Sequence, residues 1–183
     1  MGVRTAARPA PSQLPEKIGN LLQESRWLAL GAVALFLSMA LWGYHKDDPG
    51  WSHAALAAQI TNPGGKFGAW LADLMLYLFG LSAWWWVAFL AFLVAWGYRR
   101  LELMETNQRH LSVAMAGFGV LLLSSTGIEA LRFWSLKTPL PLAPGGMLGH
   151  EVARLLETYL GFGGGTLILL TRFGLGLSRF SGV

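Results

Sequence analysis

The stretch WLALGAVALFLSMALWGY, residues 27–44, decides the fold class, because it holds eighteen consecutive residues without a charge. As an α-helix it would be about 27 Å long, close to the thickness of a bilayer's hydrocarbon core. Trp27 at one end and Trp42 and Tyr44 at the other stand where an aromatic belt would lie. A cleaved signal peptide is the alternative, but the apolar run is longer than a signal core. The stretch is therefore predicted to be a retained transmembrane helix.

Three further apolar stretches follow. The chain has 54% hydrophobic and only 13% charged residues, whereas an ordinary soluble domain carries about 25% charged residues. The prediction is an all-α integral membrane protein with four transmembrane helices and an outer (periplasmic) helical cap. The predicted segments are a cytoplasmic tail at 1–26, a membrane domain at 27–180 with spans at about 27–44, 79–98, 111–130 and 160–180, and outer loops at 45–78 and 131–159. Residues 1–24 are expected to be an unstructured leader, and a short amphipathic stretch around Ile18, Leu21 and Leu22 is the alternative. The third span, rich in small residues, is expected at the centre of the bundle.

The outer boundary of the second span follows from the basic pair at residues 99–100. The apolar stretch before this pair would be about 48 Å long as one helix, which is more than one span needs. Counting about twenty residues back from the pair places the outer boundary near Phe79 and Gly80. Asp73 then lies outside the lipid core, where we expect it to be solvated or hydrogen-bonded. A proton-carrying acid inside the membrane is the alternative.

Charges and periodicity place the remaining segments. Residues 147–160 alternate with a helical period, which predicts an amphipathic helix on the outer membrane surface or against the bundle. Glu129 is expected to pair with Arg132 at a membrane interface. Arg172, in the last span, is expected to snorkel to the cytoplasmic headgroups, and a polar contact inside an oligomer is the alternative. Basic residues are denser in the tail and the 99–110 loop, so both termini are predicted to be cytoplasmic.

Catalytic and metal-binding patterns are missing from the sequence. It contains no cysteine, which excludes disulfides and thiol-ligated metals, and its four histidines show no ligand spacing. The Gly64-Gly65-Lys66 run is not a nucleotide-binding loop, because Phe67 follows the lysine. Scattered basic residues argue against nucleic-acid binding by this segment itself. The segment is therefore predicted not to be an enzyme, and no cofactor is expected in it.

The segment NPGGKFGAWLAD (62–73) carries the specific pattern Gly-Gly-x-x-Gly-Ala-Trp-x-Ala-Asp, and the segment DPGWS (48–52) precedes it. The runs PGG at 144–146 and GGGT at 163–166 add to it. Together they resemble the amino-terminal transmembrane domain of the FtsK/SpoIIIE family of bacterial DNA translocases. The resemblance covers roughly residues 25–180.

This resemblance implies a membrane-anchoring and divisome-interaction domain, located in the bacterial inner membrane at the division septum, that couples septum formation to chromosome segregation. The family's motor, an ATPase that uses ATP and Mg and pumps double-stranded DNA, is absent here, so the chain is expected to be part of a longer protein. The expected partners are the lipid bilayer, other division proteins and further copies in a ring, a homohexamer, with DNA reached only through the absent motor. A small membrane transporter or channel subunit is the alternative.

Structural or interaction roles are assigned to twelve residues, and the outer cap, defined as residues 45–80 with the 147–160 helix, is predicted to be the surface that division partners contact. The twelve residues are Asp48, Pro49, Trp51, Asn62, Gly64, Gly65, Gly68, Trp70, Asp73, Gly146, Gly164 and Arg172.

Overall fold

The computed structural model describes residues 14–54, 60–103, 108–133 and 140–181, and every regular element in these ranges is a helix. The elements are α1 (Leu14–Trp42), α2 (Gly65–Phe79), the 3₁₀ helix η1 (Gly80–Ala83), α3 (Trp84–Leu103), α4 (Gln108–Arg132) and α5 (Gly146–Ser181). Four stretches within them are long and apolar enough to cross a bilayer: Glu24–Trp42, Gly65–Gly97, Ser112–Arg132 and Gly146–Phe180. The predicted four-span, all-α fold is confirmed.

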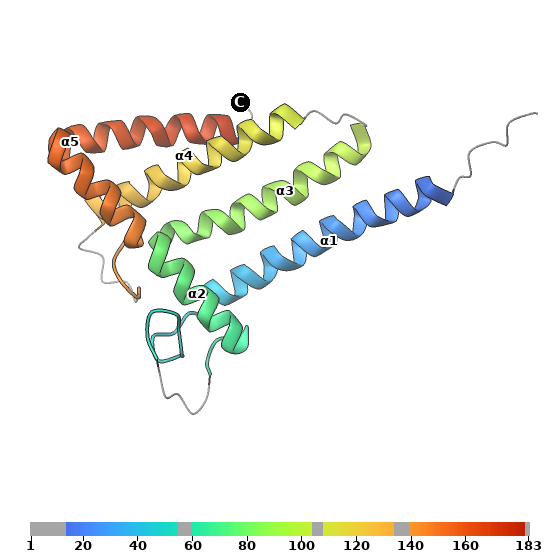
Figure 1. The fold of residues 1–183 in the computed structure, drawn as a ribbon, viewed down its shortest axis with the longest axis horizontal. Helices are drawn as coiled ribbons and strands as arrows, with labels where there is room; N and C mark the ends of the chain where they lie inside the picture. The colour runs from blue at the N-terminus through green and yellow to red at the C-terminus, as the bar shows by residue number, and fades with distance from the viewer. Residues whose placement is uncertain (1–13, 55–59, 104–107, 134–139, 182–183) are drawn as a thin grey trace, which may run out of the picture.

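The long helices lie beside one another and alternate in direction, while α2 and the loop before it project from one end of the bundle (Figure 1). Helix α1 contacts α2 and α3, and α4 makes its most extensive contacts with α5. Half of the α4 span is buried inside the molecule, against 22–28% of the other three spans. This small-residue helix is therefore the most buried of the four spans, mainly through its packing on α5.

Helix α1 packs on α3 through one buried stripe. Trp27, Ala34, Leu37 and Leu41 recur at helical spacing and are all buried. Gly97 of α3 makes room for the first of them, because a Cβ atom at Gly97 would overlap the Trp27 ring. The indole and the glycine therefore hold the inner ends of the two helices together.

Aromatic rings join α3 to the α4–α5 pair. Phe89 and Phe118 are stacked with their ring centroids 4.3 Å apart, and Phe180 packs beside both. Glycine permits the close approach of α4 and α5, because a Cβ atom at Gly176 would lie 2.7 Å from the backbone nitrogen of Leu121.

The long apolar stretch before the 99–100 basic pair is divided at Gly80. Gly80 has φ 61°, a backbone conformation that costs little only for glycine, and the chain changes direction there between α2 and α3 (Figure 1). The break lies at Phe79 and Gly80, where the sequence placed the outer boundary. The position of the lipid itself stays a prediction.

Helix α5 is divided in the same way at Gly161, where φ is 67° and ψ is 173°. Residues 146–160 lead away from the loop, and residues 162–181 return along α4, so α5 is a helical hairpin (Figure 1). Both segments pack on α4: a Cβ atom at Gly127 would lie 2.9 Å from Val152 and 3.0 Å from Leu169. The amphipathic helix thus lies against the bundle, which is one of the two arrangements the sequence allowed.

The expected unstructured leader requires a correction. Helix α1 begins at Leu14, inside the predicted tail, and residues 1–13 lie outside the described residues. Pro15 falls in the first turn of α1, where its missing N–H would have no helical partner in any case. Proline there is compatible with a helix start rather than a reason against one.

Candidate functional site

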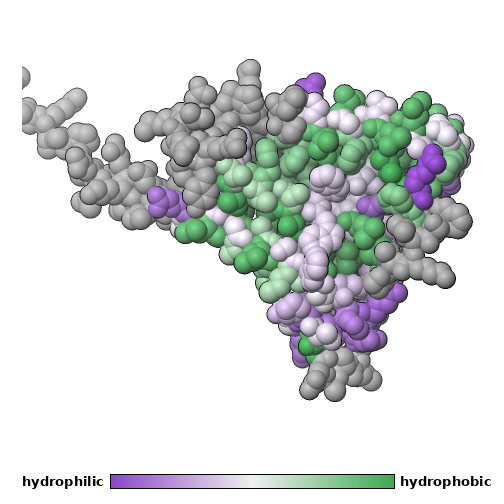
Figure 2. All heavy atoms as spheres, turned by 180° about the vertical axis from the view of Figure 1, so that it is seen from behind, coloured by the Kyte–Doolittle hydropathy of each residue, from purple (hydrophilic) through white to green (hydrophobic). Residues whose placement is uncertain are grey.

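The outer cap is the polar end of the molecule. Figure 2 shows hydrophobic side chains over most of the bundle and hydrophilic ones gathered at the tip formed by the loop before α2. Two groups of buried polar side chains support this end, one between α1 and α2 and one between η1, α4 and the start of α5.

Asp48 ties the two described parts of the first outer loop together. Its carboxylate is 2% exposed and accepts hydrogen bonds from the backbone N–H groups of Thr61 and Asn62, both at 2.8 Å. Hydrogen bonds to a carboxylate are among the stronger ones in proteins. Asp48 therefore brings residue 61 back to the end of α1, and Pro49 follows it as a partly exposed residue.

Asn62 connects the loop to helix α1. Its side-chain amide donates to the carbonyl oxygens of Ala40 at 2.8 Å and Gly43 at 3.1 Å, and its Oδ1 accepts the N–H of Gly64 at 2.8 Å. Carbonyl groups at the end of a helix lack helical partners, so Asn62 satisfies groups that would otherwise be orphaned. A Cβ atom at residue 68 would lie 2.7 Å from this Oδ1, so only glycine leaves room for the Asn62 side chain there.

Two more glycines at the start of α2 have separate reasons. Gly65 has φ 64°, and no atom would crowd a Cβ there, so its backbone conformation alone favours glycine. A Cβ atom at Gly64 would lie 2.9 Å from the Cα of Gly68, so Gly64 is required by close packing.

Asp73 is the buried acid of α2, with 1% of its surface exposed. It accepts the backbone N–H of Ser52 at 2.6 Å and the hydroxyl of Tyr44 at 3.4 Å, and His53 Nδ1 lies 3.7 Å from its Oδ1. Burial, followed by the adjacent Asp73 charge, raises the pKa of Tyr44, which lies beyond the end of α1, so this phenol remains a donor. Gly50 completes the pocket, since a Cβ there would lie 2.5 Å from the Asp73 carboxyl carbon.

The second polar group centres on Glu129, which is 6% exposed. Its carboxylate accepts hydrogen bonds from the Ser82 hydroxyl and, at 2.9 Å, from the backbone N–H of Gly145. The Ser82 and Ser125 hydroxyl oxygens lie 2.7 Å apart, and the Trp85 indole N–H donates to Ser125 at 3.0 Å. This group joins η1, α3, α4 and the loop that leads into α5.

The expected Glu129–Arg132 pair is wrong. Glu129 points to Ser82 and Gly145, whereas the Arg132 guanidinium lies over the Phe162 ring at 4.4 Å. Sequence spacing identified a possible partner on the same helix but not the partners on other segments. In the sequence, this group was indicated only by serines within apolar stretches, Ser82 and Ser125, and by Glu129 four residues after the second.

Glycines bring the loop before α5 into direct contact with the break at Gly80. A Cβ atom at Gly146 would lie 2.6 Å from the backbone nitrogen of Gly80, and one at Gly80 would overlap Gly145. Gly146 also has φ 61°. Gly164, by contrast, lies at the start of the returning segment of α5, where a Cβ would be 3.2 Å from that of Leu160.

The exposed face of α2 carries aromatic side chains. Phe67 is 64% exposed and Trp70 40% exposed, and Trp51, 48% exposed, packs against Tyr77 with 5.3 Å between ring centroids. We call Trp51, Phe67 and Trp70 the α2 aromatic face. The structure thus separates the assigned cap residues into buried supports, namely Asp48, Asn62 and Asp73, and an exposed surface.

Arg172 lies on the returning segment of α5, level with the start of α3. Its neighbour Phe173 packs edge-on against Trp85, the second residue of α3, with 5.9 Å between ring centroids. Helix α3 continues inward to Leu103. The nearer end of the bundle is therefore the end that carries the outer cap. Which headgroups Arg172 reaches stays a prediction, because it depends on the direction of the chain across the membrane.

Within the described ranges, no group of three or more His, Asp or Glu side chains is placed to hold a metal ion. The contacts of the two polar groups are internal, so their evident role is to hold segments together.

Comparison with known proteins places the chain among membrane regions of DNA translocases. Residues 19–183 match the family model described as the 4TM region of DNA translocase FtsK/SpoIIIE. The chain is 44% identical over 179 residues to DNA translocase FtsK 2 of Ralstonia nicotianae, covering 94% of this chain and 23% of that protein. It is 35% identical over 168 residues to DNA translocase FtsK 1 of Neisseria meningitidis serogroup B, covering 90% and 21%. The chain thus spans less than a quarter of the length of these relatives. No solved structure matches it.

Proposed function

The chain belongs to the family of the 4TM region of DNA translocases FtsK and SpoIIIE, and we propose that it anchors such a translocase in the bacterial inner membrane at the division septum. The observation that carries the proposal is the family match, which extends over residues 19–183 and includes all four spans. The proposed whole protein is an ATP-driven pump for double-stranded DNA, which couples chromosome segregation to septum formation. Its motor, with ATP, Mg and DNA, lies outside this chain.

The proposed orientation has both termini in the cytoplasm and the outer cap in the periplasm. An even number of spans returns the chain to the side on which it started. The basic pair at 99–100 lies at the end of the bundle opposite the cap, and this is the side that the distribution of positive charge favours as cytoplasmic. The cap then faces division proteins outside while the membrane domain holds the motor near the DNA inside.

The proposed contact surface for division partners is the α2 aromatic face. Interface anchors are enriched in tryptophan, and they work best on a rigid element. Asp48, Asn62 and Asp73 hold α2 and its loop from within. Trp51, Phe67 and Trp70 are exposed, although Phe67 stacks on Phe36 of α1. We also propose that copies of the chain assemble into a ring, as a homohexamer.

The transporter or channel alternative has less support. The buried polar side chains gather at the outer end of the bundle rather than along one helix from end to end, and the Glu129 group is engaged by backbone and hydroxyl groups. A flux assay on the chain in proteoliposomes separates the two functions, since an anchor is expected to give no flux above empty liposomes.

The experiment uses the full-length protein fused to a fluorescent reporter in cells depleted of the native one. Phe67→Ala with Trp70→Ala is expected to reduce septal localisation while leaving the membrane amount unchanged. Leu35→Ala is the matched control, because Leu35 is a large apolar residue, 71% exposed, on the lipid-facing side of α1. Normal localisation and division in the double variant would exclude the α2 aromatic face as the partner surface.

A further inference from the structure

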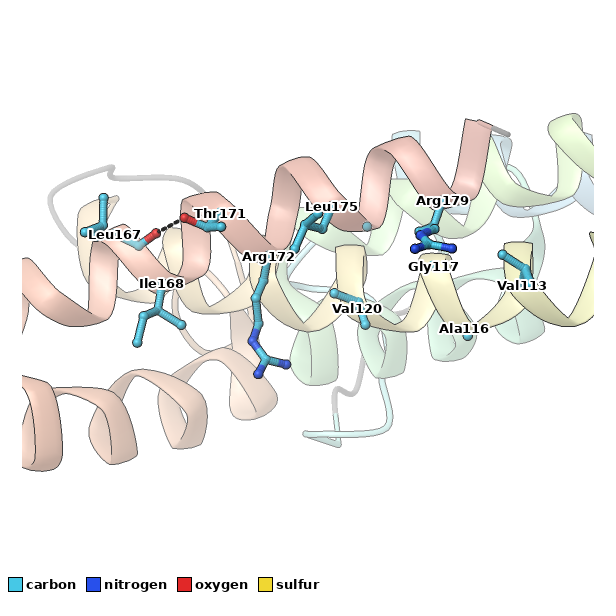
Figure 3. A pocket seen from close by; sticks show the side chains of 11 residues that line it. Val113, Ala116, Gly117, Val120, Leu167, Ile168, Thr171, Arg172, Leu175 and Arg179 are labelled. Atoms are coloured by element: carbon cyan, nitrogen blue, oxygen red, sulfur yellow. Dashed lines mark hydrogen bonds between the residues drawn. The ribbon is translucent and has the colours of Figure 1, made fainter. Parts of the chain in front are cut away.

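A groove runs between α4 and the returning segment of α5, away from the outer cap. It has a volume of about 760 Å³, and its walls are mostly apolar, with Val113 and Val120 on one helix and Leu167 and Leu175 on the other (Figure 3). This volume lies in the range of small-molecule sites, which are clefts or cavities of roughly 300–1,000 Å³. The groove is open to the surroundings of the bundle, which are lipid along these spans.

The groove carries positive charge and no negative charge. Its charged lining residues are Arg172 and Arg179, and Figure 3 shows the Arg172 side chain extending from α5 across the groove. Arg172 also lines a second groove of about 400 Å³, where Ser124 of α4 and Leu155 of the first α5 segment are among its neighbours. The described ion pairs between Arg and acid do not include Arg172, since the one recorded joins Arg154 to Glu151.

The position of Arg172 across the bilayer decides which anionic groups its side chain can reach. The contact between Phe173 and Trp85 places this part of α5 level with the outer end of α3. Side chains on a helix lean towards its amino-terminal end, which for the returning segment of α5 is the outer end. An arginine at the bilayer centre costs about 2.5–3.5 kcal/mol, and this cost falls when its head reaches the interface. Phosphate groups of the outer leaflet are the anions at that interface.

We propose that this groove binds one anionic phospholipid of the outer leaflet, with its phosphate on Arg172 and an acyl chain lying along the apolar wall towards Val113. A guanidinium can hold a phosphate by two parallel hydrogen bonds. The groove lining holds no acid, so a positively charged choline beside Arg172 would be repelled, and this favours an anionic headgroup over a zwitterionic one. The proposal does not depend on the proposed role in division.

The test titrates phosphatidylglycerol and phosphatidylcholine into the detergent-purified chain and counts bound lipids by native mass spectrometry. One phosphatidylglycerol per chain is expected to bind more tightly than phosphatidylcholine. Arg172→Gln is expected to weaken this binding about fivefold, the effect of one basic residue beside an anionic headgroup, whereas Arg172→Lys is expected to retain most of it. Ala116→Trp fills the groove from an exposed position and is expected to weaken binding with Arg172 intact.

Arg154→Gln is the matched control, because Arg154 is an exposed arginine of the same helix that does not line either groove, and it is expected to bind lipid like the parent chain. Circular dichroism verifies that each variant keeps its helix content, and Ala116→Trp tests the groove independently if Arg172→Gln fails to fold. Equal binding of the two lipids, or unchanged binding by both Arg172→Gln and Ala116→Trp, would overturn the proposal. Binding of inorganic phosphate as tight as that of phosphatidylglycerol, measured in the same way, would also overturn it. So would a photo-crosslinker at residue 116 that captures a second protein chain instead of lipid.

Discussion

Single polar residues hold the outer cap together, and Asn62 shows how much depends on one side chain. Its amide group serves two carbonyls at the end of α1 and one N–H at the start of α2. Burying such groups without partners costs about 1–3 kcal/mol for each one that cannot find water. The residue-scale predictions therefore concern stability rather than chemistry.

Asn62→Ala is expected to lower the free energy of unfolding by about 1–3 kcal/mol, because it leaves the Ala40 carbonyl buried and unpaired. Thermal unfolding in detergent, followed by circular dichroism, measures the loss. Asp47→Ala is the control, since Asp47 is a loop acid with an 88% exposed side chain, and it is expected to unfold like the parent. Equal stability of the two variants would remove Asn62 as a support.

Asp73 is, like Asn62, a buried side chain that supports the cap from within. Its substitution therefore tests the stability of the cap and not a contact with a partner. Asp73→Ala removes the acceptor for Ser52 and Tyr44 from inside the cap, so any loss of localisation would reflect a damaged fold rather than a lost contact. Changes in the α2 aromatic face are therefore the informative ones for partners.

At the scale of elements, glycines decide how helices approach and turn. Gly176 and Gly174 lie two residues apart on α5 and differ in their surroundings: a Cβ at the first would lie 2.7 Å from the Leu121 backbone, and one at the second meets nothing within 4 Å. The same glycine-to-alanine substitution at both positions therefore separates the effect of helix packing on stability from the effect of helix propensity.

Gly176→Ala is expected to destabilise the α4–α5 pair by about 1–3 kcal/mol through overpacking, whereas Gly174→Ala is expected to be neutral or stabilising by up to about 1 kcal/mol. The measurement is the thermal midpoint of both variants in the same detergent. The close α4–α5 contact would be contradicted if Gly174→Ala proved the more damaging change.

The elbow of α5 rests on Gly161 alone. Its φ of 67° disfavours any residue with a Cβ, although nothing lies within 4 Å of that position, so strain is the only penalty. Gly161→Ala is expected to open the hairpin or to cost about 1–3 kcal/mol, because φ 67° with ψ 173° is a conformation almost restricted to glycine. Gly163→Ala also meets nothing within 4 Å but has no positive φ, and it is expected to do neither.

Spin labels on cysteines introduced at residues 155 and 167 report this angle, and the absence of native cysteine leaves no background. An increase in the distance between the labels is expected for Gly161→Ala. An unchanged distance together with unchanged stability would show that the elbow does not require glycine.

For the whole molecule, the main expectation is its direction across the membrane. Single cysteines at Asp47 and Glu24, both exposed in the structure, are expected to react with a membrane-impermeant thiol reagent from the periplasmic and the cytoplasmic side respectively. Intact cells, compared with permeabilised cells, distinguish the two. Reaction of the residue-24 cysteine in intact cells would reverse the proposed orientation.

Much of this architecture was predictable from single stretches. The four spans, the outer boundary near Gly80 and the amphipathic 147–160 segment all follow from apolar length, charge and helical period. That the helix breaks at Gly80 became evident only in the structure. The Glu129 group could not be predicted, because its members come from three segments far apart in the sequence. The packing of Phe173 beside Trp85 could not be predicted either, because the position of α5 along α3 depends on the hairpin at Gly161.

The sequence by itself determined that this is a membrane protein, how many spans it has and to which family it belongs. The family is confirmed by the match over residues 19–183. The reason is that a helix must be long enough to cross the hydrocarbon core, so every span is a continuous stretch of about twenty apolar residues that can be recognised in the sequence. Only the tertiary structure decided which cap residues are supports and which form a surface, and which end of the bundle Arg172 approaches. Burial and depth depend on the segments that meet around a residue, so Asp73 and Trp70, three residues apart in one motif, have opposite environments.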